Sequence, residues 1–214
     1  MLISDKKQFL FYHVYKVAGS SIRNNLLPYS NKKQIFNQAI YHSLNVTFGF
    51  KAKDPLSKYH PYLKDVRDHL GDKYWKYYKF CFVREPLDWQ KSLYFFMKKN
   101  NNHFQHKIVK DMTFDDYLYW RLNNDIKFQS DFIFDGDVKL VDDIFKFESL
   151  KEDFNLVCNR LNIEYALKHM NMAGNGKAIE LRLSTLELFI DKHLEEYKLL
   201  GYDIELVRER TVLI

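Results

Sequence analysis

The chain alternates short apolar runs with segments in which apolar residues recur every three or four positions. The runs FLFYHVY (9–15), KFCFV (79–83) and IFKF (144–147) are apolar on both faces, as the strands of a buried parallel sheet are. A helical pattern follows each run. We therefore predict an α/β fold, with a parallel sheet flanked by helices, in a single domain over residues 1–214.

Two later segments place apolar residues on one helical face. In the first, these residues are Leu150, Phe154, Val157 and Leu161, with Asn162 as the expected end. In the second, they are Leu183, Leu186, Ile190, Leu194 and Tyr197, with Gly201 as the expected end. Each set predicts the face that packs on the core. The segment KKNNNHFQH (98–106) is expected to be a polar loop between two patterned halves.

Composition and charge narrow the class of protein. With 46% apolar and 17% aromatic residues, the chain is globular rather than disordered. No apolar run reaches the roughly 18 residues that span a bilayer, and the charged N-terminal segment does not look like a signal peptide, so we expect a cytoplasmic protein. Cys81 and Cys158 lie in apolar patterns and are expected to be core thiols. A net charge of +5 suits an anionic ligand but is too small to predict a nucleic-acid partner.

The first predicted strand runs into YKVAGSSI (15–22). A strand, a turn of small residues and a helix form the phosphate cradle of P-loop-like folds. We expect Gly19 to permit the turn and Ser20 or Ser21 to cap the helix. The free amides of the first helical turn would then point at one anion, with Lys16 reaching over it. The alternative is a capped turn with a surface lysine.

The second predicted strand runs into FVREPLDWQKSLY (82–94). Pro86 suits the first turn of a helix, and Glu85 or Asp88 suits its positive end. Arg84 directly follows the strand, and its planar, permanently charged guanidinium is a good phosphate ligand. The alternative is a structural ion pair with Glu85 or Asp88. Because the ligands of parallel sheets lie at the carboxyl ends of the strands, Lys16 and Arg84 are both candidates for the same site.

Together, HVYKVAGSSI (13–22) and FVREPLDWQKSLY (82–94) resemble the paired cofactor signatures of sulfotransferases. The closer likeness is to the carbohydrate-type family of heparan 2-O- and chondroitin sulfotransferases and their bacterial relatives. The resemblance implies transfer of a sulfuryl group from 3′-phosphoadenosine 5′-phosphosulfate (PAPS) to a hydroxyl of a glycan or other acceptor, without a metal. The product of the donor would be 3′-phosphoadenosine 5′-phosphate (PAP).

The resemblance also assigns roles to residues. The first loop would hold the 5′-phosphosulfate, and the second would bind the 3′-phosphate. The residues carried over are Lys16, Ala18, Gly19, Ser20, Ser21 and Ile22 in the first loop, and Arg84 and Ser92 in the second, with Tyr94 completing the pattern. Lys16 would also neutralise the bridging oxygen as the sulfur–oxygen bond breaks.

Weaker likenesses extend over most of the chain. They lie in residues 58–80, in FKFESL (145–150), in HMNMAGNGKA (169–178) and in EYKLLGYDI (196–204). In the third of these, Lys177 is the basic residue expected to face the nucleotide or the substrate. Departures from the family pattern are Tyr15 in place of a proline, Val17 and Ala18 in place of threonine and glycine, and Glu85 in place of Asp or Asn.

The acceptor hydroxyl must lose a proton, and a neutral histidine is the usual base. His60 lies in the segment that resembles the family's Lys-His motif, although Tyr59 separates it from Lys58. We expect His60 to be the base, titrating near pH 6–7, with Glu148 and His42 as alternatives. The other interpretation is an ordinary loop histidine, and His13 is expected to be structural.

Two other functions remain open on the sequence. A kinase or other P-loop nucleotide enzyme would require a lysine directly before Ser or Thr, whereas Lys16 precedes Ser20 by four positions. A catalytically inactive sulfotransferase-like binding module would bind the nucleotide without transfer. The acceptor and the oligomeric state are not specified by the sequence, because acceptor loops vary within a fold.

Overall fold

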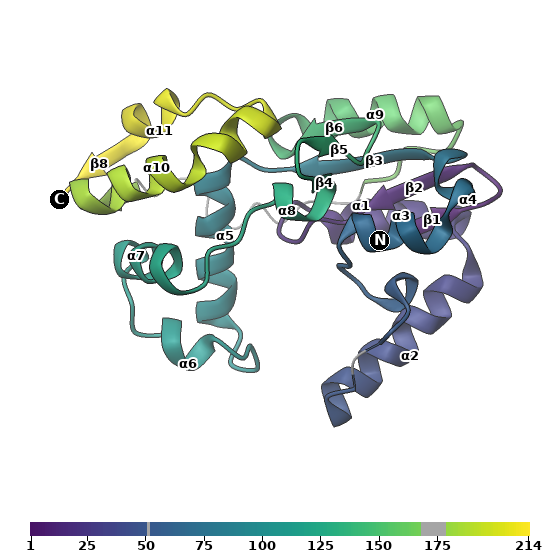
Figure 1. Ribbon diagram of the computed structural model, residues 1–214, viewed down its shortest axis with the longest axis horizontal. Coiled ribbons are helices and arrows are strands. Elements are labelled where there is room, and N and C mark those ends of the chain that lie inside the picture. Colours follow the sequence, from purple (N-terminus) through teal and green to yellow (C-terminus); the bar gives the residue numbers. More distant parts are fainter. Residues whose placement is uncertain (51, 168–178) are drawn as a thin grey trace. The chain divides into compact units, whose positions relative to one another are not determined.

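The structure is a computed structural model that describes residues 1–50, 52–167 and 179–214 (Figure 1). The chain divides into two compact units. Unit 1 comprises residues 1–83 and 131–170, and unit 2 comprises residues 84–130 and 171–214. The single domain expected over residues 1–214 stays a prediction.

Unit 1 is built on a four-stranded mixed sheet of order β1-β2-β3-β6. The strands are β1 (Leu2–Ser4), β2 (Phe9–Tyr12), β3 (Tyr78–Val83) and β6 (Asp143–Lys146). Strand β1 is antiparallel to β2, while β2, β3 and β6 are parallel to one another. The α/β class and the three parallel strands expected from the sequence are confirmed. Strand β2, however, ends at Tyr12 and not at Tyr15, so the residues from His13 onward belong to the loop.

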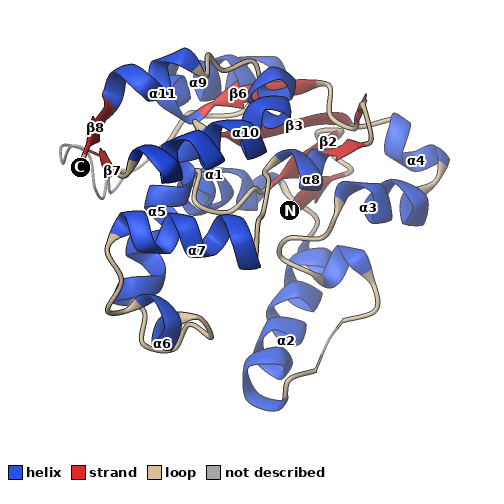
Figure 2. Cartoon of the chain, turned by 60° about the vertical axis from the view of Figure 1, so that its left-hand side comes forward, coloured by secondary structure: helices blue, strands red, loops and turns tan. Residues whose placement is uncertain are grey.

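Helices cover both faces of this sheet (Figures 1 and 2). Helix α9 (Leu150–Leu161) lies on one face, where Phe154 meets the ring of Phe82 with centroids 6.3 Å apart. On the opposite face, the Tyr12 hydroxyl donates to the Pro61 carbonyl just before helix α3 (Leu63–Leu70). Helix α1 (Gly19–Leu26) is joined to the segment after α9, because the Asn25 side chain donates to the Glu164 carbonyl at 2.9 Å. The buried face predicted for α9 is confirmed, and Asn162 ends the helix in the left-handed conformation. Cys81 and Cys158 are buried free thiols, as expected.

Helix α2 (Lys32–Phe48) also belongs to unit 1 and buries polar side chains. The Gln34 side chain accepts a hydrogen bond from the Ile3 amide at 2.9 Å, and the fully buried Gln38 donates to the carbonyl of Leu56 at 3.1 Å. The apolar side chains of Phe36 and Phe48, by contrast, are 65% and 77% exposed. The helix is therefore attached to unit 1 by side-chain amides rather than by an apolar stripe.

Smaller elements complete unit 1. They are the 3₁₀ turns Leu27–Tyr29, Pro55–Ser57 and Phe147–Ser149, helix α4 (Asp72–Trp75), and the strands β4 (Phe134–Asp135) and β5 (Val138–Lys139). Helix α8 (Ser130–Ile133) begins at the last residue of unit 2 and continues into unit 1.

Unit 2 is mainly helical. Its elements are α5 (Pro86–Lys99), α6 (His106–Val109), α7 (Phe114–Asn124), α10 (Leu183–Leu200) and α11 (Glu205–Arg210), with the parallel strand pair β7 (Ile179–Leu181) and β8 (Thr211–Leu213). The predicted polar loop is observed at residues 100–105, but its ends belong to α5 and α6. Helix α5 begins at Pro86, as predicted.

The buried face of α10 agrees with the prediction at Leu186 and Tyr197, which are buried, but not at two other leucines. Leu183 and Leu194 are 51% and 45% exposed, whereas His193 and Glu196 are almost fully buried. Glu196 is buried because it accepts a hydrogen bond from the Gln129 amide at 2.5 Å, a partner that the helical pattern does not reveal. The predicted end at Gly201, in the left-handed conformation, is confirmed.

Candidate functional site

The loop between β2 and α1 contains the expected phosphosulfate residues and turns in an unexpected way. Lys16 (φ 67°) and Ala18 (φ 58°) adopt the left-handed conformation, which non-glycine residues seldom do. Helix α1 begins at Gly19, and Ala18 is its N-cap residue without a side-chain hydrogen bond. The expectations that Gly19 makes the turn and that Ser20 or Ser21 caps the helix are therefore wrong.

Instead, the absence of a side chain at Gly19 allows the His13 ring to lie against the backbone there. A Cβ atom at this position would lie 1.7 Å from Nε2 and 1.8 Å from Cδ2 of His13. The His13 ring therefore occupies the space beside the first turn of α1, and it stacks on the ring of Phe11 at 6.0 Å. His13 thus packs directly against the loop, and its assignment as a structural residue stays a prediction.

The backbone of the first turn leaves a small set of donors for an anion. The Ser21 and Ile22 amides donate to the Ala18 carbonyl at 3.0 Å and 3.3 Å. This corrects the expectation that they are free. The amides of Gly19 and Ser20 come earlier in the turn, where a helix supplies no backbone acceptor. These two amides, the positive end of α1 and the half-buried Lys16 form the candidate anion cradle of unit 1.

His60 lies against the same loop. Its Nδ1 atom is 2.7 Å from the His13 carbonyl oxygen, and its ring meets the His13 ring at 4.8 Å and the Tyr15 ring at 5.7 Å. The Tyr12 hydroxyl, which donates to the Pro61 carbonyl, anchors the next residue to β2. Two expected catalytic residues, Lys16 and His60, thus belong to one loop cluster of unit 1.

The contact with His13 determines the tautomer of His60. A carbonyl oxygen can only accept, so Nδ1 of His60 must carry the hydrogen, and the neutral ring has its lone pair on Nε2. Partial loss of hydration, together with the nearby charges of the N-terminal ammonium and Arg23, lowers the pKa of His60 to about 4, while part of the residue's surface stays exposed to solvent. The ring is therefore neutral at physiological pH. The value near 6–7 expected for an ordinary histidine is not the one that this environment gives.

The two alternative bases lie on other elements of unit 1. His42 is exposed on α2, where its ring meets the edge of Tyr59 at 4.9 Å. Glu148 is exposed in the 3₁₀ turn that follows β6. His60, whose ring contacts His13 and Tyr15 of the loop, stays the candidate base.

In unit 2, Glu85 organises the start of α5. Its carboxylate caps the helix by accepting from the Leu87 and Asp88 amides at 3.1 Å and 2.9 Å. It also accepts a hydrogen bond from the Tyr197 hydroxyl of α10, and it pairs with Arg210 at 3.0 Å. The placement of Glu85 at the positive end of the helix is confirmed. Its longer side chain connects α5, α10 and α11.

Arg84 is held by a side chain that the sequence did not single out. Gln129 is fully buried, accepts from the Arg84 amide at 2.9 Å and donates to the Arg84 carbonyl at 2.7 Å. Because the Gln129 backbone is bound in turn by Glu196, this pair of bonds fixes the backbone of Arg84 within unit 2. No local pattern marks such a contact between residues far apart in the chain.

Positive charge gathers near the start of α5. Burial lowers the pKa of Lys91, and the nearby charges of Arg84 and Arg210 lower it further, against the opposing effect of Asp88. Lys91 therefore shares its surroundings with Arg84, and an anion there would relieve the repulsion between them. Ser92, the next residue of α5, is half-buried. Lys91 is an additional candidate phosphate ligand.

The remaining expected residues are less informative. Tyr94 is buried and donates to the Met112 carbonyl at 2.8 Å, so its hydroxyl supports unit 2. Lys177 lies outside the described residues. Among the described residues, no group of three or more His, Cys, Asp or Glu side chains could hold a metal ion. None of the described helices is both long and apolar enough to cross a membrane.

The chain matches one family of known proteins. Residues 1–176 match the model of the sulfotransferase family. The chain belongs to the sulfotransferase family. The matched range includes the Lys16 loop, His60, Arg84 and Ser92, which are the described candidate residues of both units. No curated protein and no solved structure gives a significant match. The family supports sulfuryl transfer in general, and a sulfotransferase acts on a hydroxyl acceptor.

Proposed function

We propose that this sulfotransferase moves a sulfuryl group from PAPS to a hydroxyl of a carbohydrate acceptor. The observation that carries the proposal is the position of His60, whose tautomer is set by the same loop that presents Lys16 and the first-turn amides. A proton acceptor and an anion cradle on one loop are the two parts that transfer to a hydroxyl requires.

The candidate residues of the two loops would bind different groups of the donor. Lys16 and the Gly19 and Ser20 amides would hold the 5′-phosphosulfate, and Arg84, Lys91 and Ser92 would bind the 3′-phosphate. PAPS supplies an activated sulfuryl group on a phosphate leaving group. The acceptor oxygen forms the new bond to sulfur while the bond from sulfur to the bridging oxygen breaks.

Two residues of the chain would then act on the proton that leaves the acceptor and on the charge that develops on the leaving group. His60 Nε2 takes the proton of the acceptor hydroxyl, and Lys16 stabilises the negative charge that develops on the leaving phosphate. The products are a sulfate ester, PAP and a proton on His60. Bound anionic donor would raise the pKa of His60 above its value in the free protein, which makes the imidazole a better base when the donor is present.

Thermal shifts test the donor assignment. At a PAP concentration one hundred times its dissociation constant, linkage should stabilise the fold by about 2.7 kcal/mol. ATP lacks the 3′-phosphate that Arg84 is assigned to bind, so it should stabilise much less. Equal shifts from PAP and ATP would support a P-loop nucleotide enzyme and contradict the proposal.

Two substitutions test the separate roles. Arg84→Ala should chiefly weaken PAP binding, whereas Lys16→Ala should slow transfer at saturating PAPS by the equivalent of about 3–4 kcal/mol. Lys110→Ala, at an exposed lysine of unit 2, is the control and should change neither. Radiolabelled sulfate transfer to a panel of glycans and small alcohols gives the rates. Tight PAP binding with no transfer to any acceptor would favour an inactive binding module.

A further inference from the structure

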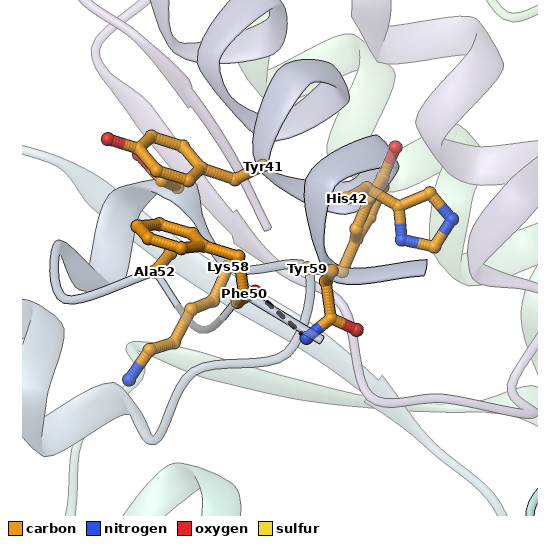
Figure 3. Close-up of a pocket in the computed structure, with 8 residues that line it drawn as sticks. Tyr41, His42, Phe50, Ala52, Lys58 and Tyr59 are labelled. Atoms are coloured by element: carbon orange, nitrogen blue, oxygen red, sulfur yellow. Dashed lines mark hydrogen bonds between the residues drawn. The ribbon is translucent and has the colours of Figure 1, made fainter. Parts of the chain in front are cut away.

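A pocket of about 220 Å³ lies in unit 1 between α2 and the segment that follows it (Figure 3). Its wall includes Tyr41, His42 and Asn45 of α2, and Phe50, Lys58 and Tyr59 of the following segment. None of these residues belongs to the donor cradle described above. The pocket is therefore a separate feature of the unit that contains His60.

The wall combines flat rings with hydrogen-bonding groups. The rings of Tyr41 and Phe50 stack on each other (Figure 3). Their planes are 18° apart, and their centroids are 6.0 Å apart. The Asn45 side chain donates to the Phe50 carbonyl at 3.0 Å, which ties that segment to α2. The Tyr41 hydroxyl and the Lys58 ammonium add polar groups. A ligand with one apolar face and a polar edge would match this wall.

The size of the pocket limits what it can hold. An apolar cavity of about 150 Å³ is enough for benzene, and the clefts that enclose drug-sized ligands begin at about 300 Å³. At about 220 Å³, this pocket has room for one six-membered ring with its substituents.

The pocket adjoins the candidate base through Tyr59. The Tyr59 ring belongs to the wall, and its centroid is 6.4 Å from that of His60, the next residue. The guanidinium of Arg23, on α1, lies 5.3 Å from the Tyr59 ring centroid. A ring packed on Tyr59 would therefore touch the residue whose own ring lies beside the group assigned to take the proton.

We propose that this pocket binds one pyranose ring of the acceptor, next to the sugar whose hydroxyl is sulfated. The C–H face of the pyranose would pack on Tyr41 and Phe50, and its hydroxyls would meet Asn45 and Lys58. The inference rests on the proposed function, because it takes His60 as the base. It adds that the acceptor is at least a disaccharide and that Tyr41 and Phe50 determine its binding.

Direct binding tests this inference independently of turnover. Lactose, cellobiose and chitobiose serve as disaccharide probes, methyl β-glucoside as the single-ring probe and tyrosinamide as a phenolic probe. Each is titrated by saturation-transfer NMR into the full chain, with and without saturating PAP. We expect a disaccharide to bind more tightly than methyl β-glucoside, and Tyr41→Ala or Phe50→Ala to weaken it at least tenfold. Phe36→Ala, on the same helix and 65% exposed outside the pocket wall, should leave binding unchanged.

The outcomes separate this inference from the donor assignment. Thermal shifts with PAP should be the same in all three variants, which also shows that they fold. If PAP binds and no sugar does, or if Phe36→Ala weakens a sugar as much as Phe50→Ala, the pocket assignment is overturned and the donor assignment stands. Selective loss of tyrosinamide binding in the pocket variants would overturn it in favour of a phenolic acceptor. Loss of PAP binding in the unsubstituted chain would overturn the proposed function, while the titrations without PAP still report on the pocket.

Discussion

Substitution of Gly19 by alanine tests whether the Lys16 loop depends on its contact with His13. The new Cβ atom would lie 1.7 Å from His13 Nε2, whereas ordinary van der Waals contacts of such an atom begin at 3.4 Å. Either the imidazole ring must leave or the first turn of α1 must move by more than 1 Å. The ring is not free to rotate away, because it is stacked against Phe11 and meets His60 edge-on.

The expected cost follows from overpacking. Forcing an extra carbon into a filled site typically costs about 1–3 kcal/mol, which lowers the melting temperature of a chain of this size by roughly 2–10 °C. Displacing catalytic groups by about 1 Å can slow a reaction about a hundredfold. We therefore expect Gly19→Ala to lower both stability and transfer, measured by urea unfolding and by sulfate transfer.

A double-mutant cycle isolates the contact. His13→Ala removes the ring that the new methyl group strikes, so Gly19→Ala should cost much less in that background than in the native chain. Ser20→Ala, at the exposed neighbouring position, is the matched control and should be nearly neutral. If Gly19→Ala costs less than about 0.5 kcal/mol, or if the two substitutions are additive, the close approach does not govern the loop.

Three further predictions concern buried or desolvated groups. The ring-proton NMR titration of His60 should give a pKa near 4 in the free protein and a higher value with PAP; a pKa of 6–7 without ligand would show that the ring is hydrated. Gln129→Leu should lower the free energy of unfolding by roughly 2–4 kcal/mol and weaken PAP binding about tenfold, because it releases the backbone of Arg84. The control Gln90→Leu, at another fully buried glutamine of unit 2, should lower stability without changing PAP binding. If the two variants bind PAP equally well, Gln129 does not position Arg84. Burial lowers the pKa of His193 to about 4, below its value in the unfolded chain. The free energy of unfolding should therefore fall by on the order of 3 kcal/mol as pH falls from about 6.5 to about 4. Urea unfolding at several pH values should show a smaller fall in His193→Phe, and the same dependence on pH in both proteins would contradict this prediction.

Elements defined by local chemistry were predictable from the sequence. Pro86 and Glu85 mark the start of α5 because a proline without an amide and a carboxylate both suit the first turn of a helix. The buried face of α9 follows from the spacing of its apolar residues. Lys16 follows strand β2 and Arg84 follows strand β3, and both residues lie in the range that matches the family model.

Contacts between distant residues were not predictable in the same way. In the Lys16 loop, local propensity favours a turn at Gly19 and a cap at Ser20 or Ser21. The observed loop instead has Lys16 and Ala18 in the left-handed conformation and the His13 ring packed against Gly19. The helical pattern of α10 predicts that Leu194 is buried, but it contains no information on the hydrogen bond between Gln129 and Glu196 that accompanies the burial of Glu196. The lowered pKa of His60 likewise arises from loss of hydration in the folded chain, which no motif encodes.

The attachment of α2 by two glutamines affects the stability of the helical turns that line the pocket between α2 and the segment after it. Gln34 and Gln38 secure the early turns of the helix, whereas the turns from Tyr41 to Phe48 bury no complete side chain. Local unfolding of these later turns should cost little free energy, so their amides should exchange with deuterium much faster than those near Gln38. Because Tyr41 and Asn45 form one wall of the pocket, a bound ring would slow that exchange. Part of its binding energy would then be spent on ordering the last turns of a helix.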